Sequence, residues 1–162
     1  MNKPTTALEV AKYIVHMCDE YGELITHLKL QKILYYAQAD YLVKNKGVPL
    51  FDDPIEAWQY GPVVQSVYKT YKQFGRNPIS ILIESINLEE EQKRQIDKTL
   101  SYCLCASATE LVNSIHSEDP WIDAYKSVRN GGSNVISTDS MYKFYSSLEK
   151  SREDLLAAID NK

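Results

Sequence analysis

The segment Ile55-Glu56-Ala57-Trp58-Gln59-Tyr60-Gly61-Pro62-Val63-Val64 places two large aromatic residues, a glycine and a proline in one short connector. Gly61 tolerates backbone angles that a residue with a Cβ resists. Pro62 suits the first position of a helix, where the N–H that it lacks would have no partner. The segment therefore predicts a rigid corner that fixes the positions of Trp58 and Tyr60. It holds no obvious catalytic pair, so it favours recognition over bond-breaking chemistry.

Length, composition and charge indicate an ordinary globular protein. A chain of 162 residues predicts a single domain. The apolar fraction of 44% and the charged fraction of 25% are typical of soluble domains. The net charge of −4 argues against a protein that grips nucleic acid, because such binding depends on clustered Lys and Arg. Nucleic acid is therefore not the expected partner.

The number and spacing of the cysteines indicate the cellular compartment of the protein. Cys18, Cys103 and Cys105 are odd in number and lack the spacing of a disulfide framework. Free thiols are favoured over one bridge plus a reactive thiol. The sequence also shows no apolar N-terminal secretory segment and no apolar run long enough to span a bilayer. These features predict a cytoplasmic protein without a membrane partner.

Capping residues predict two helices before the corner. Thr6 with Glu9 is a capping box, and the helix that it opens should end near Tyr21-Gly22. A second helix is predicted from His27 to Asn45, with Thr26 as its cap. We expect it to be amphipathic and docked along one stripe. The stripe comprises Leu30, Ile33, Leu34, Ala37 and Tyr41, and the opposite side Lys29, Lys32, Gln38 and Lys44.

The region around the corner predicts extended and turn structure. Residues 47–54 are rich in turn-forming residues. Short extended pieces at Leu50-Phe51 and at Ile55–Gln59 are expected to pair as a small hairpin. A third helix is predicted from Pro62 to Phe74, stopping at Gly75.

Helical signals also dominate the second half. Asn87 with Glu90 and Ser107 with Glu110 predict two capped helices. The remaining expected elements are a helix opened by Asp119-Pro120-Trp121 and ending near Asn130, an extended Val135-Ile136, and helices over Met141–Leu148 and Glu153–Ile159. The predicted fold is mainly α, a single compact helical domain with a short β-hairpin or extended corner in the middle.

One cluster suggests chemistry. His116, Ser117 and Asp119 predict, as an alternative function, a hydrolase or nuclease in which His116 is the general base. Helix capping explains the same residues, and we expect no enzyme. The three histidines and three cysteines form no closely spaced ligand pair. No catalytic, cofactor-binding or metal-binding residues are predicted, and no cofactor.

The aromatic content is unusual. Twelve residues are tyrosines, a type that combines a large contact area with a polar tip and is enriched in protein interfaces. The clustered members are Tyr35, Tyr36, Tyr41, Tyr60, Tyr68 and Tyr71. Together with the corner they favour a protein-binding face.

These motifs also resemble a known family. The helix motif Leu30–Gln38 is similar to that of the Panacea antitoxin domain, found in SocA-like or GepA-like phage-associated proteins. The segments similar to the family's central signature are Gly47–Phe51, Ile55–Trp58, Tyr60–Val64 and Val67-Tyr68. Those similar to its C-terminal signature are His116–Trp121 and the glycine pair near Gly131. The resemblance runs from Leu8 to Tyr145. It departs at Ala39-Asp40, where the family often has a small residue, and residues beyond Leu148 match nothing in it.

The resemblance implies an antitoxin of a bacterial or prophage toxin–antitoxin system. Such a protein neutralises its cognate toxin, encoded by an adjacent gene, through direct protein contact. The implied domain covers residues 1–148, with residues 149–162 as a C-terminal helical tail of the same unit. Expected partner-binding residues, or their structural support, are Trp58, Tyr60, Gly61, Pro62, Tyr68 and Tyr71, with Asp119, Pro120 and Trp121 as a second signature. A DNA-binding autoregulator is a further alternative, and the oligomeric state stays open.

Overall fold

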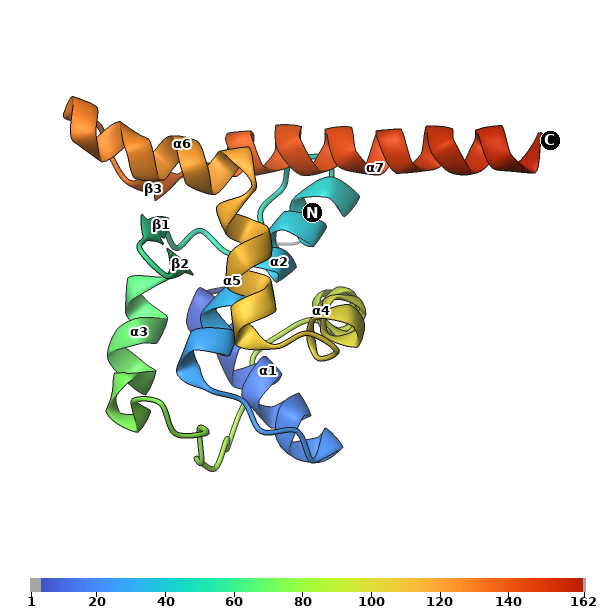
Figure 1. The fold of residues 1–162 in the computed structure, drawn as a ribbon. Coiled ribbons are helices and arrows are strands. Elements are labelled where there is room, and N and C mark those ends of the chain that lie inside the picture. Colours follow the sequence, from blue (N-terminus) through green and yellow to red (C-terminus); the bar gives the residue numbers. More distant parts are fainter. Residues whose placement is uncertain (1–3, 162) are drawn as a thin grey trace.

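A computed structural model describes residues 4–161. Within that range the chain forms seven α-helices and a small three-stranded sheet, which lies at one side of the molecule between α3 and α6 (Figure 1). The helices are α1 Ala7–Tyr21, α2 His27–Lys44, α3 Gln65–Tyr71, α4 Glu90–Cys103, α5 Ala108–His116, α6 Asp119–Ser127 and α7 Thr138–Asp160, with 3₁₀ turns at Lys72–Phe74 and Val128–Asn130. The strands are β1 Ile55–Trp58, β2 Gly61–Val63 and β3 Val135–Ile136. The predicted fold class is therefore confirmed. The expected domain ranges are residues 1–148 and 149–162, of which residues 1–3 and 162 lie outside the described residues.

The central element is α2, which packs against α1, α3, α4, α5, α7 and β2. The prediction that α2 docks along a single stripe was wrong. Lys32 and Gln38, expected on its outer side, are both 0% exposed. Because neighbours cover α2 on nearly every side, polar residues of its middle turns have to lie inside the protein, where each needs a hydrogen-bond partner.

These buried side chains bind the backbone of residues 50–64, which crosses α2. The Gln38 amide accepts from the N–H groups of Leu50 (2.8 Å) and Phe51 (3.3 Å) and donates to the Phe51 carbonyl (2.7 Å). Gln31 makes the same type of pair with Val64, accepting from its N–H (2.9 Å) and donating to its carbonyl (3.3 Å). A buried loop cannot leave its polar groups unpaired, so the two glutamines replace a sheet partner.

The sheet has the order β2-β1-β3, and both pairings of β1 are antiparallel. The expected hairpin exists, but its strands are β1 and β2, joined by Gln59-Tyr60, and Leu50-Phe51 takes no part in it. Phe51 instead bridges Thr5. Pro62 was predicted to start a helix, yet it lies in β2 and α3 begins at Gln65. A proline fits β2 because β2 is an edge strand, where a missing N–H removes no ladder bond.

Helix ends follow the capping signals in most places. Thr6, Thr26 and Ser107 cap α1, α2 and α5 as predicted, and Gly22 ends α1 with a φ of 70°. Two predictions were wrong. The capping box of α4 is Glu89 with Gln92, because the Asn87 N–H donates to Glu9 instead.

The second wrong prediction was that Asp119 caps α6. Glu118 occupies the N-cap position of α6 instead and makes no side-chain cap bond. Its carboxylate turns inward and accepts from the hydroxyl groups of Tyr36 (3.4 Å), Ser114 (3.3 Å) and Tyr145. This hydroxyl cluster ties α6 to α2, α5 and α7. Asp119 itself is exposed.

The C-terminal helix α7 is continuous over 23 residues. The two separate helices predicted for Met141–Leu148 and Glu153–Ile159 are thus one element, because Glu149 to Arg152 contains no helix-breaking residue. Figure 1 shows α7 lying across the body and extending well past it. No helix within residues 4–161 is both long and apolar enough to cross a membrane.

We expect Gln38→Met to lower the free energy of unfolding by about 3 kcal/mol, because the backbone groups of Leu50 and Phe51 would stay buried without partners. Urea denaturation measures the change. Gln59→Met, in the exposed hairpin turn, is the matched control and should change stability by less than about 0.5 kcal/mol. Equal effects of the two substitutions would contradict this role of Gln38.

Candidate partner-binding site

The corner presents a row of aromatic side chains at the surface. Tyr60, in the hairpin turn, is 65% exposed, and Tyr68, on α3, is 37% exposed. Trp58 is half-buried and its ring lies 5.2 Å from that of Tyr68. The His27 ring also lies 5.2 Å from that of Tyr68. Three elements, β1, α3 and the start of α2, therefore hold these rings in place.

The aromatic row borders a cavity of about 400 Å³ between α2, the hairpin and α3. The side chains that form its walls are mainly aromatic or apolar, and Leu28 and Tyr60 at its rim are well exposed. The lining residues are His27, Leu28, Gln31, Lys32, Trp58, Gln59, Tyr60, Val63, Tyr68 and Gly75. A pocket with apolar walls and a few polar groups is the usual form of a binding site.

Lys32 is one of the polar residues beside this cavity, together with His27, Gln31 and Gln59. Its side chain is 0% exposed, and the ammonium donates to the Pro62 carbonyl at 2.8 Å. Burial lowers the pKa of Lys32 from its ordinary value to about 7. The residues that line the cavity include no carboxylate.

Gly61 is required next to Lys32. Its φ of 101° is in the region that favours glycine. A Cβ at this position would lie 2.8 Å from Lys32 Cε. Gly61 thus allows the hairpin to close over the lysine, which explains its place in the corner.

The second signature contacts the first through one hydrogen bond. The Trp121 indole Nε1 donates to the Trp58 carbonyl at 3.0 Å. Pro120 and Trp121 are buried, and the Trp121 ring stacks on Tyr125 with centroids 4.6 Å apart. Two motifs that lie 63 residues apart in the chain are therefore neighbours.

The predicted site residues separate into a surface set and a supporting set. Trp58, Tyr60 and Tyr68 lie around the cavity. The supporting residues, which are buried, are Gly61, Pro62, Tyr71, Pro120 and Trp121. Tyr71, at 2% exposure, belongs to the core. The sequence prediction did not include Leu28 and Lys32, because Lys32 lies 30 positions before Pro62 in the chain and only the fold brings the two together.

The alternative catalytic cluster lacks the arrangement that hydrolysis needs. The Ser117 hydroxyl donates to the Ser114 carbonyl at 2.7 Å. His116 stacks on Trp121 with ring centroids 4.1 Å apart, and its Nε2 is buried without a hydrogen-bond partner in the described residues. A general base has to reach the hydroxyl that it activates. Residues 4–161 also contain no group of three or more His, Cys, Asp or Glu that could hold a metal ion, and all three cysteines are free.

Comparison with known proteins links this architecture to one family. The model of the family described as "Antitoxin SocA-like, Panacea domain" matches residues 30–122, which include the corner and the Trp121 contact. Antitoxin SocA of Caulobacter vibrioides (strain NA1000 / CB15N) is 45% identical over 51 residues. That match covers 32% of this chain and 27% of the relative, so the chain aligns with only about a quarter of the relative's length. No solved structure matches.

We expect Gly61→Ala to lower the free energy of unfolding by about 3 kcal/mol, from backbone strain and from displacement of Lys32. Gly22→Ala is the matched control, because its φ of 70° is also positive but nothing lies within 4 Å of the added Cβ. It should cost only about 1 kcal/mol. Thermal or urea denaturation measures both. Equal costs would show that the Lys32 contact is unimportant.

The Lys32 amine should make stability depend on pH. Between pH 7 and the ordinary lysine pKa, the unfolded chain holds a proton that the folded chain releases, since burial lowers the pKa to about 7. The free energy of unfolding should therefore rise by about 2 kcal/mol from pH 7 to pH 9 relative to Lys32→Met, which lacks the titrating group. Urea denaturation at both pH values tests this. The same pH dependence in both proteins would contradict it.

Proposed function

Because this chain belongs to the antitoxin SocA-like Panacea domain family, whose model matches more than half of it, we propose that it neutralises a protein toxin by binding it directly. The observation that carries the proposal is the row of aromatic side chains that borders the cavity, in which Tyr60 and Tyr68 are exposed and Trp58 is half-buried. The toxin is proposed to be the product of an adjacent gene. The cytoplasm is the proposed compartment, in keeping with three free thiols.

The corner has the properties of an interface centre. Tyr60 and Tyr68 offer exposed aromatic area with polar tips, and such residues dominate the binding energy of many interfaces. The chain between these two residues is held at Val64 and Pro62 by hydrogen bonds with Gln31 and Lys32. A pre-ordered surface loses little conformational entropy when it binds. The anchors therefore need no rearrangement before contact.

The cavity chemistry restricts what the toxin inserts. Its walls suit an apolar or aromatic side chain, whereas Lys32 is 0% exposed and its amine is bonded to the Pro62 carbonyl, so a partner does not reach it. We therefore propose that the toxin places an apolar or aromatic side chain in the cavity. Around it, a stable complex would bury about 1,600 Å² in total.

The other two functions are not proposed. Hydrolysis by His116, Ser117 and Asp119 would need the Ser117 hydroxyl, which is bonded to the Ser114 carbonyl. Operator binding would need clustered cations, whereas the net charge is −4.

We expect Tyr68→Ala to abolish or strongly reduce rescue of bacterial growth when the chain is co-expressed with the protein of the adjacent reading frame. Loss of an interface tyrosine of this kind costs about 2 kcal/mol, or about 30-fold in affinity. Calorimetric titration of the two purified proteins gives the same comparison. The fold should persist, because Tyr68 is partly exposed.

Tyr21→Ala is the matched control for this test. Tyr21 is 54% exposed at the end of α1 and does not line the cavity, so its loss should leave rescue intact. Undiminished rescue by Tyr68→Ala at matched expression would remove the corner from the proposed interface. Loss of rescue by both variants would instead indicate a general effect of tyrosine removal.

A further inference from the structure

A second groove, of about 400 Å³, lies between the end of α1, the chain that joins α1 to α2, and residues 78–82. Leu82 is 82% and Leu24 79% exposed, the highest values among the large apolar side chains of residues 4–161, and both line this groove. The remaining apolar lining residues are Val15, Cys18, Ile25, Pro78, Ile79 and Ile81. Single exposed leucines are ordinary, but exposed apolar side chains gathered around one hollow mark a contact site.

Backbone hydrogen bonds hold the walls of the groove in place. The Ile79 N–H donates to the Ile25 carbonyl at 2.8 Å, and Ile25 itself belongs to the core. The Glu23 N–H donates to the Cys18 carbonyl at 2.8 Å, which fixes the turn after α1. A groove that is formed before the partner arrives loses little conformational entropy on binding.

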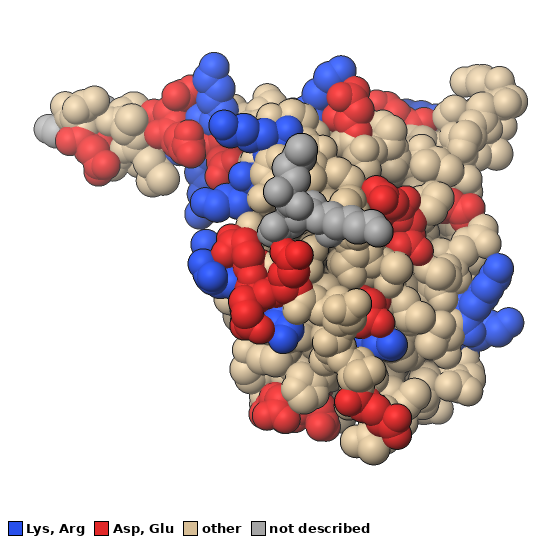
Figure 2. All heavy atoms as spheres, turned by 180° about the vertical axis from the view of Figure 1, so that it is seen from behind, with Lys and Arg blue, Asp and Glu red and all other residues tan. Residues whose placement is uncertain are grey.

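The charged residues that line the groove are acidic. They are Asp19 and Glu23, both exposed, and the neighbouring Glu20 is exposed as well. The three cations nearest along the chain do not line the groove; they are Lys12, Lys29 and Arg76. In Figure 2 the lower edge of the molecule shows acidic side chains and no Lys or Arg, and Figure 1 places the end of α1 at this edge. The rim of the groove therefore attracts positive charge.

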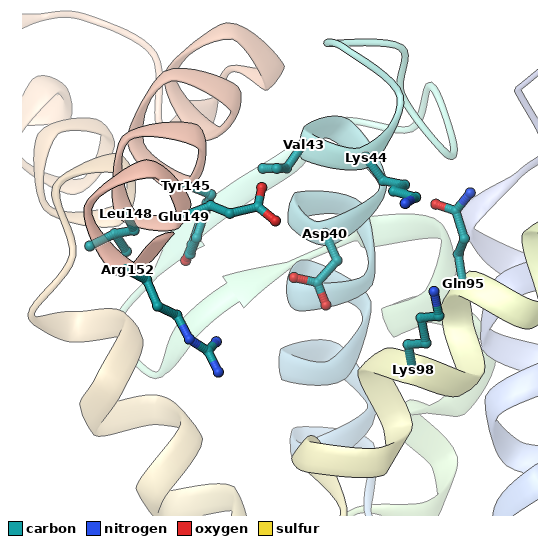
Figure 3. Close-up of a pocket in the computed structure, with 9 residues that line it drawn as sticks. All are labelled: Asp40, Val43, Lys44, Gln95, Lys98, Tyr145, Leu148, Glu149 and Arg152. Carbon is teal, nitrogen blue, oxygen red and sulfur yellow. The ribbon is translucent and has the colours of Figure 1, made fainter. Parts of the chain in front are cut away.

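The larger cleft between α2, α4 and α7, of about 760 Å³, lacks a single sign of charge. Figure 3 shows Lys98 and Arg152 around it together with Asp40 and Glu149. Because cations and carboxylates both line this cleft, its charge favours no particular partner. The groove at the end of α1 does favour one, and the mixed-charge cleft offers residues for matched controls.

The groove adjoins the corner cavity. Leu24 lines the groove, Leu28 lines the cavity, and between them Thr26 forms a bridge with Pro78. On the opposite wall Pro78 lines the groove, and Gly75, three residues earlier, lines the cavity. A partner that covers the corner therefore reaches the groove within one interface of standard size.

We infer that the toxin-binding surface continues from the corner into this groove, and that the toxin fills the groove with a segment that combines apolar side chains with Lys or Arg. The apolar side chains lie between Leu24 and Leu82, and the cation meets Asp19 and Glu23. The inference rests on the proposed function, because it assigns a second part of the same interface. It adds the chemistry of the partner, an apolar segment with positive charge.

Calorimetric titration of the full chain with the protein of the adjacent reading frame tests the apolar contact. Leu82→Ser should raise the Kd about tenfold, because the complex loses the burial of an apolar side chain. Leu148→Ser is the matched control, since Leu148 is also exposed but lines the mixed-charge cleft, and it should leave the Kd nearly unchanged. Circular dichroism verifies that both variants fold.

Charge reversal tests the acidic rim. Glu23→Lys should raise the Kd about fivefold at low ionic strength, because the cation of the toxin is then repelled. It should also reduce the increase in Kd that added salt causes, since salt screens the attraction present in the wild type. Glu149→Lys makes the same charge change at the mixed-charge cleft and should preserve both the Kd and its salt dependence.

The outcomes separate this inference from the proposed function. If Tyr68→Ala weakens binding while Leu82→Ser and Glu23→Lys bind as the wild type does, the inference is overturned and the proposed function stands. A wild type that does not bind the toxin would overturn both. Sedimentation equilibrium of the chain alone covers a different occupant: a dimer that Leu82→Ser dissociates would assign the groove to a second copy and overturn the inference.

Discussion

The hydrogen bonds from α2 to the backbone of residues 50–64 are the constraint on which the rest of the structure depends. Gln31, Lys32 and Gln38 extend from a helix covered on nearly all sides and bind the crossing chain at Val64, Pro62 and the Leu50–Phe51 pair. Side-chain amides in these positions both donate and accept, as a neighbouring strand would. The loop can therefore pass through the interior without a full sheet beside it.

This arrangement also explains which parts of the fold the sequence could predict. Helix starts at Thr6, Thr26 and Ser107 are local, because the capping side chain and the N–H that it binds are only three residues apart. The burial of Lys32 and Gln38 is not local. It follows from six elements that converge on α2, and a pattern within 18 residues cannot report neighbours that come from elsewhere in the chain.

Pro62 shows the same limit at a single residue. Its fixed φ fits both a helix start and an edge strand, and what selects the strand is the pairing of Ala57 with Pro62 and the bond from Lys32. The sequence predicted the aromatic members of the candidate site, because tyrosine and tryptophan are residue types that are enriched in protein interfaces. The cavity between them, and the lysine beside it, required three-dimensional information.

The hydroxyl cluster around Glu118 has a mechanical consequence. Tyr145, at the root of α7, donates to Glu118, which also accepts from Tyr36 of α2 and Ser114 of α5. Every described residue of α7 from position 147 onward is exposed, so this cluster and the buried Met141 set the angle of an arm about 20 Å long. A tilt of about 5° at the root would move the tip by about 2 Å. A small shift among α2, α5 and α6 would therefore produce a larger displacement of the end of α7, at the far edge of the molecule.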